Sequence, residues 1–213
     1  MNLAGRVDAV VIGASAGGIE ALAVLLPALP PGQRAPVMIV LHLPRDRPSV
    51  LAEIFSRKCL LPVREAEDKE QIAPGTVYFA PNNYHLLVDD GPQLALSADD
   101  PVHHSRPSID VLFESAVEVY QGRLLGIILS GANEDGAAGL AAIHDAGGVT
   151  VVQSPQSARA PHMVLSALKL RPASAVLTLE EIVGLLRTLD AVADAVADAD
   201  AVTVAVAVPV GMN

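Results

Sequence analysis

The sequence has no tryptophan, and aromatic residues make up only 3% of its 213 residues. With 51% hydrophobic residues the chain can still form a full core, but aliphatic side chains must fill it. The length suits one sizeable domain. Cys59 is the only cysteine, which excludes an intrachain disulfide. This cysteine usage is typical of a reducing compartment, so we expect a cytoplasmic location.

Basic residues are also few. The chain has 14 Lys and Arg against 24 Asp and Glu, a net charge of −10. The basic residues are scattered, which disfavours nucleic acid and an anionic membrane surface as partners. The sequence does not start with a basic segment followed by an apolar one, so we expect no signal peptide. It also lacks the apolar run of about 18 residues that a membrane-spanning helix needs, so we expect no membrane insertion.

Apolar runs alternate with helix-like segments along the chain. The predicted strands are "DAVVIG", "PVMIVLHL", "GTVYFAP", "YHLLVDD", "QLALS", "LLGIILSG" and "VTVVQ". The predicted helices are "GGIEALAVLLPAL", "SVLAEIFSRK", "SIDVLFESAVEVY", "DGAAGLAAIHDAGG", "PHMVLSALKL" and "LEEIVGLLRTLDAV". Thr178 and Glu181 have the spacing of a capping box at the start of the last one. The pattern predicts an α/β fold: a doubly wound, mostly parallel sheet with helices on both faces, in a Rossmann-like three-layer architecture.

The composition changes near the end of the chain. From about Ala191 the sequence is rich in Ala, Asp and Val. We therefore divide the chain into a domain over 1–190 and a C-terminal extension over 191–213. The alternation in "VTVAVAVPV" suits a weak edge strand or a loose tail. We assign no chemistry to this extension.

Reactive side chains follow three of the predicted strands: Ser15 after the first, His42 at the end of the second, and Asp135 just after "LLGIILSG". In a doubly wound sheet, ligands and catalytic groups collect at the carboxyl ends of the strands. We therefore look for the functional site at this edge of the sheet.

One interpretation of the turn around Ser15 is a dinucleotide site. The template G-x-G-x-x-G would fall on Gly13, Ser15 and Gly18, so its second glycine is a serine. The template also needs an acidic residue at the end of the second strand, where this chain has His42 and then Pro44. Two of the expected features are missing, which disfavours this interpretation.

A second interpretation makes Ser15 a nucleophile, and a third makes it only a helix cap. "GASAG" fits G-x-S-x-G between a strand and a helix, where glycines allow a sharp turn that projects the hydroxyl. The N–H groups at the start of the following helix could stabilise an oxyanion. Serine is, however, also a good N-cap, and the pentapeptide by itself favours capping.

His42 and Asp135 change this balance. Each has a simpler explanation, since His42 could be a hydrogen-bonded core residue and Asp135 could cap the helix that follows it. Three such coincidences at one edge of the sheet are less probable than one site. A serine nucleophile needs a base, and the base needs an acceptor that fixes its tautomer. Ser15, His42 and Asp135 supply these parts, in an order that differs from that of α/β-hydrolases.

The remaining histidines are weaker candidates. His85 follows "APNNY" in an expected turn, and His103 and His104 lie in a loop before "SRPS". His144 and His162 fall on predicted helices. The sequence has no HExxH and no paired CxxC, and neighbouring histidines project in different directions in most backbone conformations. A metal site is therefore disfavoured.

With these residues in place, the chain resembles the catalytic domain of the bacterial chemotaxis protein-glutamate methylesterases (CheB). The matching pieces are "IGASAGG", "VLHLP", "VYFAPNNYHL", "HHSRPSIDVLFESAV" and "LSGANEDGAAGL". They cover the chain from Val7 to Leu189. The resemblance implies a Ser–His–Asp triad at Ser15, His42 and Asp135.

The resemblance also implies an activity. It implies hydrolysis of glutamate γ-methyl esters on chemoreceptors, often with deamidation of specific glutamines, and no cofactor. The implied substrate is the cytoplasmic helices of methyl-accepting chemoreceptors. Further partners would be a chemotaxis methyltransferase, a histidine kinase or a separate receiver protein. Backbone N–H groups near Ala16, Gly17 and Ala132 would hold the oxyanion. Arg45, Arg47 and Arg106 are candidates for contacting acidic receptor helices, against the simpler reading as ordinary solvated arginines.

The sequence departs from the family pattern at several points. Ala16 stands where threonine is common, and Ala132 stands where the family commonly has a methionine whose N–H is thought to help the oxyanion. Glu134, beside Asp135, could raise the basicity of the histidine or face solvent. The family's N-terminal receiver domain is not seen before the serine strand, so we expect an open site and activity without a phosphodonor. Two alternatives stay open: a non-catalytic signalling module that docks with a methyltransferase or histidine kinase, and an esterase for a small molecule.

Overall fold

The computed structural model describes residues 1–43 and 50–189. Its central feature is a seven-stranded sheet in the order β3-β4-β2-β1-β7-β8-β9, with every neighbouring pair parallel. Its strands are β1 (Ala9–Ala14), β2 (Val37–Leu41), β3 (Val63–Glu65), β4 (Val77–Phe79), β7 (Leu124–Ile128), β8 (Val149–Gln153) and β9 (Ala175–Leu177). A separate antiparallel hairpin pairs β5 (His85–Asp89) with β6 (Gln93–Ser97). The predicted α/β fold with a parallel sheet is confirmed.

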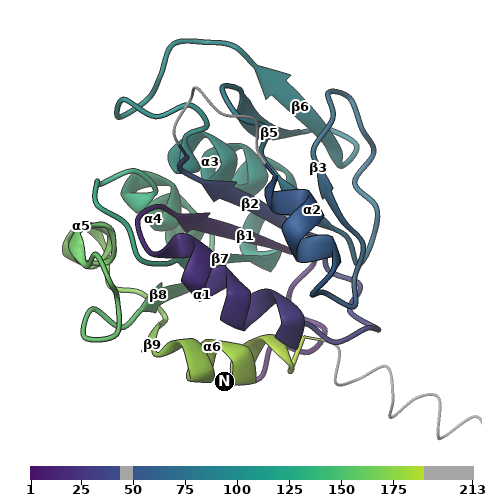
Figure 1. Ribbon diagram of the computed structural model, residues 1–213. Helices are drawn as coiled ribbons and strands as arrows, with labels where there is room; N and C mark the ends of the chain where they lie inside the picture. Colours follow the sequence, from purple (N-terminus) through teal and green to yellow (C-terminus); the bar gives the residue numbers. More distant parts are fainter. Residues whose placement is uncertain (44–49, 190–213) are drawn as a thin grey trace, which may run out of the picture.

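Helices cover both faces of the sheet (Figure 1). One face carries α1 (Gly18–Leu25), α2 (Leu51–Ser56) and α6 (Leu179–Leu186), whose apolar side chains share one core cluster with the strands. The other face carries α3 (Ile109–Tyr120), α4 (Ala137–Asp145), α5 (His162–Leu170) and the β5–β6 hairpin, which share a second cluster. The side chains of the central strands alternate between the two clusters, as the period-two geometry of a strand requires.

Several predicted boundaries need correction. The helix expected to run to Leu29 ends at Leu25 and gives way to a short 3₁₀ helix over Leu26–Ala28. Pro27 explains the change, because its ring cannot continue an α-helix and it donates no backbone hydrogen bond. The last helix ends at Leu186, earlier than expected, although its capping box between Thr178 and Glu181 is present.

The sequence pattern missed two strands, β3 and β9. Both are three residues long and lie at opposite edges of the sheet. Edge strands bury only part of their side chains, so they lack the continuous apolar run that identifies the central strands. The expected extension over 191–213, as well as Arg45 and Arg47, lie outside the described residues.

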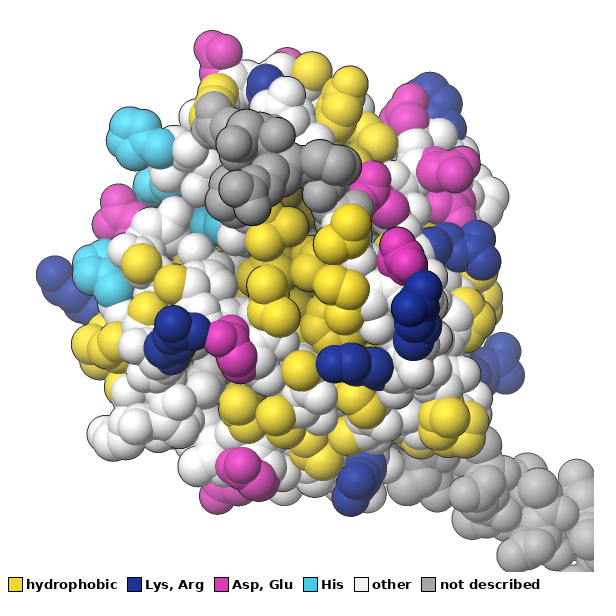
Figure 2. Space-filling model, in the orientation of Figure 1, with side chains coloured by type: hydrophobic (Ala, Val, Ile, Leu, Met, Phe, Trp, Pro, Cys, Tyr) yellow, Lys and Arg dark blue, Asp and Glu magenta, His cyan; other side chains and the backbone are white. Residues whose placement is uncertain are grey.

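Hydrophobic side chains are exposed on the face that α1 and α2 cover, where Figure 2 shows them gathered near the middle of the view. Ile19 and Val24 on α1 are 45% and 42% exposed, and Ile54 on α2 is 42% exposed. No helix in the described part of the chain is long and apolar enough to cross a membrane.

Candidate active site

Ser15 lies on the turn that joins β1 to α1. Its backbone N–H donates to the carbonyl of Ser130 (2.9 Å), and its own carbonyl accepts from Gly18 (2.8 Å). The N-cap of α1 is Gly17, with φ of 84° and no side-chain cap bond. Within the described residues the Ser15 hydroxyl makes no hydrogen bond. The helix-cap interpretation of Ser15 is therefore wrong, and the hydroxyl is left half-exposed at the edge of the sheet.

The turn requires a glycine at position 17. A Cβ there would lie 2.8 Å from both Ser130 Oγ and Arg159 Cβ, in addition to the strain of the left-handed backbone. Ser130, in the loop after β7, fixes the turn, because its hydroxyl donates to the carbonyl of Ala16 (2.7 Å) and accepts from the N–H of Ala160 (2.8 Å). No motif in the sequence predicts this role of Ser130.

Three backbone N–H groups at this edge have no acceptor within the described residues, namely those of Ala16, Gly17 and Ala132. They are the donors that the sequence analysis placed in an oxyanion hole. Both Ala16 and Ala132 are exposed. The two loops that carry them are held together through Ser15 and Ser130. Unpaired N–H groups beside a nucleophile are the donors that stabilise a tetrahedral oxyanion.

His42 follows β2, next to Ser15 across the sheet. Its N–H donates to the carbonyl of Ala14 (3.0 Å), so the parallel register of β1 and β2 continues one residue past Leu41. The side chain is 12% exposed, and its Nε2 lies 2.8 Å from Asp135 Oδ2. The hydrogen bond expected between Ser15 and His42 is not among those of the described residues. Such bonds are often long without substrate.

Asp135 is fully buried and accepts four hydrogen bonds. They come from His42 Nε2 (2.8 Å), the Ser108 hydroxyl (2.8 Å) and the backbone N–H groups of Ile109 (2.7 Å) and Asp110 (3.1 Å). Burial by itself would raise the pKa of Asp135, but the bonds from His42, Ile109 and Asp110 outweigh it and hold the pKa below the usual value. Asp135 is therefore a carboxylate at neutral pH.

The alternative role for Asp135, as the cap of the helix that follows it, is wrong. The N-cap of α4 is Gly136, and no side chain caps it. Asp135 instead receives the free N–H groups at the start of α3, a helix far away in the sequence. The positive end of α3 therefore stabilises this carboxylate.

A second layer of buried residues lies behind Asp135, and no motif in the sequence predicts it. Ser108 is fully buried, and its N–H donates to Nδ1 of His85 (3.1 Å). His85 is 2% exposed, and its Nε2 lies 3.2 Å from the carbonyl of Asp100. Because Nδ1 accepts from Ser108, Nε2 is the nitrogen that donates to the carbonyl of Asp100. His85 begins β5 and does not lie in the turn expected for it.

Arg106 does not project freely. Its guanidinium donates to the carbonyls of Ala98 (2.6 Å) and Asp99 (2.9 Å) and to Asn83 Oδ1 (2.9 Å). Arg106 borders a small hollow together with His42. Because these bonds occupy most of its donors, its first role is to hold this loop in place.

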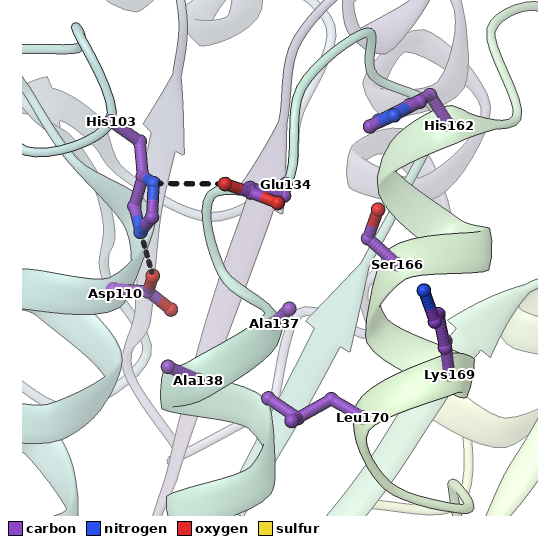
Figure 3. Close-up of a pocket in the computed structure, with 9 residues that line it drawn as sticks. All are labelled: His103, Asp110, Glu134, Ala137, Ala138, His162, Ser166, Lys169 and Leu170. Carbon is purple, nitrogen blue, oxygen red and sulfur yellow. Dashed lines mark ion pairs between the residues drawn. The ribbon is translucent and has the colours of Figure 1, made fainter.

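Glu134 and Asp110 are linked by one histidine, as Figure 3 shows. His103 Nδ1 lies 3.5 Å from Glu134 Oε1, and His103 Nε2 lies 3.5 Å from Asp110 Oδ2. The Glu134 side chain is 65% exposed, so it points away from the buried contact of His42 with Asp135. Burial raises the pKa of Asp110 to about 6. In the described part of the chain, no cluster of three His, Cys, Asp or Glu could hold a metal ion.

Fold and site together define an α/β protein that carries a serine, a histidine and an aspartate at the carboxyl edge of a parallel sheet. The model of one family, the CheB methylesterase, matches residues 10–186. The chain belongs to this family.

Individual relatives agree with the family match. A putative protein-glutamate methylesterase/protein-glutamine glutaminase from Leptospira interrogans is 45% identical over 183 residues, which is 86% of this chain and 95% of the relative. A protein-glutamate methylesterase/protein-glutamine glutaminase from Anaeromyxobacter dehalogenans is 40% identical, and the match spans 87% of this chain and 54% of that protein. The crystal structure of the Thermotoga maritima CheB methylesterase catalytic domain superposes with a TM-score of 0.80 at 31% identity, covering 84% of this chain and 97% of that one.

Proposed function

We propose that Ser15, His42 and Asp135 are the nucleophile, the base and the orienting carboxylate of a protein-glutamate methylesterase. The reaction follows from the family: the chain is a protein-glutamate methylesterase/protein-glutamine glutaminase of chemotaxis, acting on chemoreceptor methylglutamates. The observation that carries the assignment of residues is the 2.8 Å contact between His42 Nε2 and the buried Asp135. His42 follows β2, the strand next to β1, and Ser15 follows β1. The Ser15 hydroxyl makes no hydrogen bond in the described part of the chain.

The contact with Asp135 supports one nitrogen of His42, Nδ1, as the base. An ionised carboxylate only accepts hydrogen bonds, so Nε2 must carry the proton. The lone pair is then on Nδ1, which is the atom that would remove the proton of Ser15. The ring is therefore used in the opposite sense from the well-known protease triad, in which Nδ1 faces the aspartate.

The reaction would proceed in two acyl-transfer steps. Ser15 Oγ attacks the carbonyl carbon of the γ-methyl ester while its proton moves to His42 Nδ1. The N–H groups of Ala16, Gly17 and Ala132 would stabilise the oxyanion of the tetrahedral intermediate. His42 then protonates the leaving methoxide, and methanol departs.

The acyl-enzyme is resolved by water. His42 Nδ1 takes a proton from the water as its oxygen attacks the acyl carbon, and the Ser15 oxygen leaves with that proton. The product is a glutamate carboxylate. With a glutamine side chain, ammonia replaces methanol as the leaving group, and the remaining steps are the same. One site can therefore support both reactions named for the family.

The direct test is Ser15→Ala, measured by methanol release from methylated chemoreceptors and by hydrolysis of a small methyl ester. We expect turnover to fall by about 10⁶-fold, the loss seen when a triad serine is removed. Ser56→Ala, at an exposed position on α2, is the matched control and should keep full activity. A serine-directed phosphonate should label the wild type but not Ser15→Ala. Near-normal turnover of Ser15→Ala would remove the basis of the proposal.

A further inference from the structure

A second cavity lies beside the active site, between the start of α4 and the side of α5 (Figure 3). Its volume is about 440 Å³, which is ample for one or two amino-acid side chains. Ala137, Ala138 and Leu170 form its apolar part. We call this cavity the α5 pocket.

One wall of the α5 pocket consists of hydrogen-bond acceptors. It is formed by Glu134 and Asp110, with His103 between them. Asp110 is 5% exposed, and its Oδ1 accepts from the N–H of Gly139 (2.7 Å). Glu134 is mostly exposed and presents its second carboxylate oxygen at the rim. The buried Asp110 is fixed by its hydrogen bond to Gly139, and the exposed Glu134 supplies an acceptor at the rim of the pocket.

The opposite wall consists of donors. His162, Ser166 and Lys169 occupy positions i, i+4 and i+7 of α5, which places them along one face of the helix. In Figure 3 all three side chains point towards the pocket. Among the residues that the structure describes, none of the three side chains has a hydrogen-bond or ion-pair partner. An ammonium group and a hydroxyl group are therefore available to a ligand.

The α5 pocket and the active site are linked by separate hollows that share lining residues. A neighbouring hollow shares His103, Glu134 and His162 with it and adds His104. His104 also borders the hollow that contains His42. Figure 2 shows histidine side chains gathered along this edge of the molecule. A polypeptide bound with one side chain at His42 would reach the α5 pocket with another.

The turn that carries His103 and His104 is strained. Their φ angles are 46° and 62°, and the flanking residues Val102 and Ser105 pair with each other through two backbone hydrogen bonds. This is the left-handed turn in which asparagine and glycine are normally found. Two consecutive histidines in it cost free energy, and such strain persists mainly at functional sites.

We propose that the α5 pocket binds the side-chain carboxamide of a glutamine in the substrate polypeptide, a few residues from the methyl ester that is hydrolysed. A carboxamide has both a donor and an acceptor, which match the acceptor wall at Glu134 and the donor wall at Ser166 and Lys169. A carboxylate would pair with Lys169 but would face the two carboxylates of Glu134 and Asp110, and an aliphatic side chain would leave both walls unpaired. The proposal rests on the proposed function, because the glutamine binds in the α5 pocket while the methyl ester lies at Ser15.

The test uses methyl-ester peptides in which glutamine, glutamate or alanine is placed at each of two to eight positions on either side of the ester. At the best position, the wild type should prefer glutamine over alanine by about tenfold in kcat/KM, as expected for hydrogen bonds to charged groups. This ratio should fall to about one in Lys169→Met and to an intermediate value in Ser166→Ala. Because both peptides are measured on the same variant, any loss of folded protein cancels.

Lys58→Met is the matched control. Lys58 is an exposed lysine just after α2, on the other face of the sheet, and its variant should keep the full preference. The proposal is overturned if the wild type shows no preference at any position, if Lys169→Met retains it, or if glutamate is preferred over glutamine. These outcomes are separate from the triad, because hydrolysis of a small methyl ester by the wild type and its loss in Ser15→Ala test the triad alone.

Discussion

Two buried aspartates meet at the start of α3, and their pKa values are shifted in opposite directions. Asp135 is 0% exposed and Asp110 is 5% exposed, yet the pKa of Asp135 is held low while burial raises the pKa of Asp110 to about 6. Asp135 accepts four hydrogen bonds, whereas the Asp110 carboxylate accepts one short bond, from Gly139. Both carboxyl groups are buried, and the larger number of donors at Asp135 is what lowers its pKa while the pKa of Asp110 rises.

The difference suits the two positions. Asp135 must stay ionised to keep the Nε2 proton on His42, and the N-terminus of α3 supplies the donors that achieve this. Asp110 lies in the first turn of the same helix, where the donors near its carboxylate are the N–H of Gly139 and the more distant His103, and the charges of Asp135 and Glu114 raise its pKa further. Asp135 and Asp110 are thus neighbours in space, but their pKa values are shifted in opposite directions.

Among the changes that test this contrast, the largest effect is expected from replacing Asp135 by asparagine. The amide keeps the shape, but its NH₂ group can donate to His42 Nε2, which would move the proton of the ring to Nδ1 and remove the base. We expect kcat to fall by about 10⁴-fold, as for the same change in a protease triad. Steady-state kinetics on a small methyl ester measures it. A loss below tenfold would contradict the role of Asp135.

The second prediction concerns Asp110 and pH. A raised pKa means that the folded state keeps a proton that the unfolded chain releases, so stability falls as pH rises from about 4 to about 6. Asp110→Asn mimics the protonated form and should abolish this fall. At pH 7 we expect the variant to be more stable than the wild type by up to about 2–3 kcal/mol, and at pH 4 to be equal to it. Urea unfolding at the two pH values measures the difference.

Asp135 should behave in the opposite way in the same experiment. Its lowered pKa contributes stability that is present above its usual pKa and is lost as pH falls through the folded value. Asp135→Asn should therefore be less stable than the wild type at pH 7, and this deficit should shrink towards low pH. If both asparagine variants had the same pH dependence, the contrast between the two carboxyl groups would be wrong.

A smaller effect is expected for Ser108→Ala. It removes one donor from Asp135 Oδ1 and leaves the other three in place. We expect kcat to fall about tenfold, in line with the loss of one hydrogen bond to a charged group. The acid limb of the pH–rate profile should move to higher pH, because the Asp135 carboxylate loses one donor. Ser56→Ala is again the matched control. An unchanged pH–rate profile would show that this hydroxyl does not act through Asp135.

The smallest effect is expected for Glu134→Gln. The side chains of Glu134 and His103 are 65% and 40% exposed, and their atoms lie 3.5 Å apart. Exposed pairs of this kind contribute little, so the free energy of unfolding should change by less than about 0.5 kcal/mol. Thermal unfolding at neutral pH measures it. A change above about 1 kcal/mol would mean that Glu134 supports the fold as well as the rim of the α5 pocket.

The sequence by itself determined the fold class and the three central candidates. Continuous apolar runs identified β1, β2, β7 and β8, because a strand buried on both faces must be apolar throughout. The rule that parallel strands present their carboxyl ends at one edge then brought Ser15, His42 and Asp135 together. The edge strands β3 and β9 were not predicted, because they are too short and too exposed to show a continuous apolar run.

Only the tertiary structure excluded the helix-cap roles of Ser15 and Asp135. Local sequence favours Ser15 and Asp135 as caps of the helices that follow them, but glycines take both cap positions. Asp135 instead accepts hydrogen bonds from Ser108 and Ile109 at the start of α3. The residues next to Asp135 in the sequence do not predict this contact. The orientation of His42 and the layer behind Asp135 depend on contacts between distant segments, and these exist only once the chain has packed.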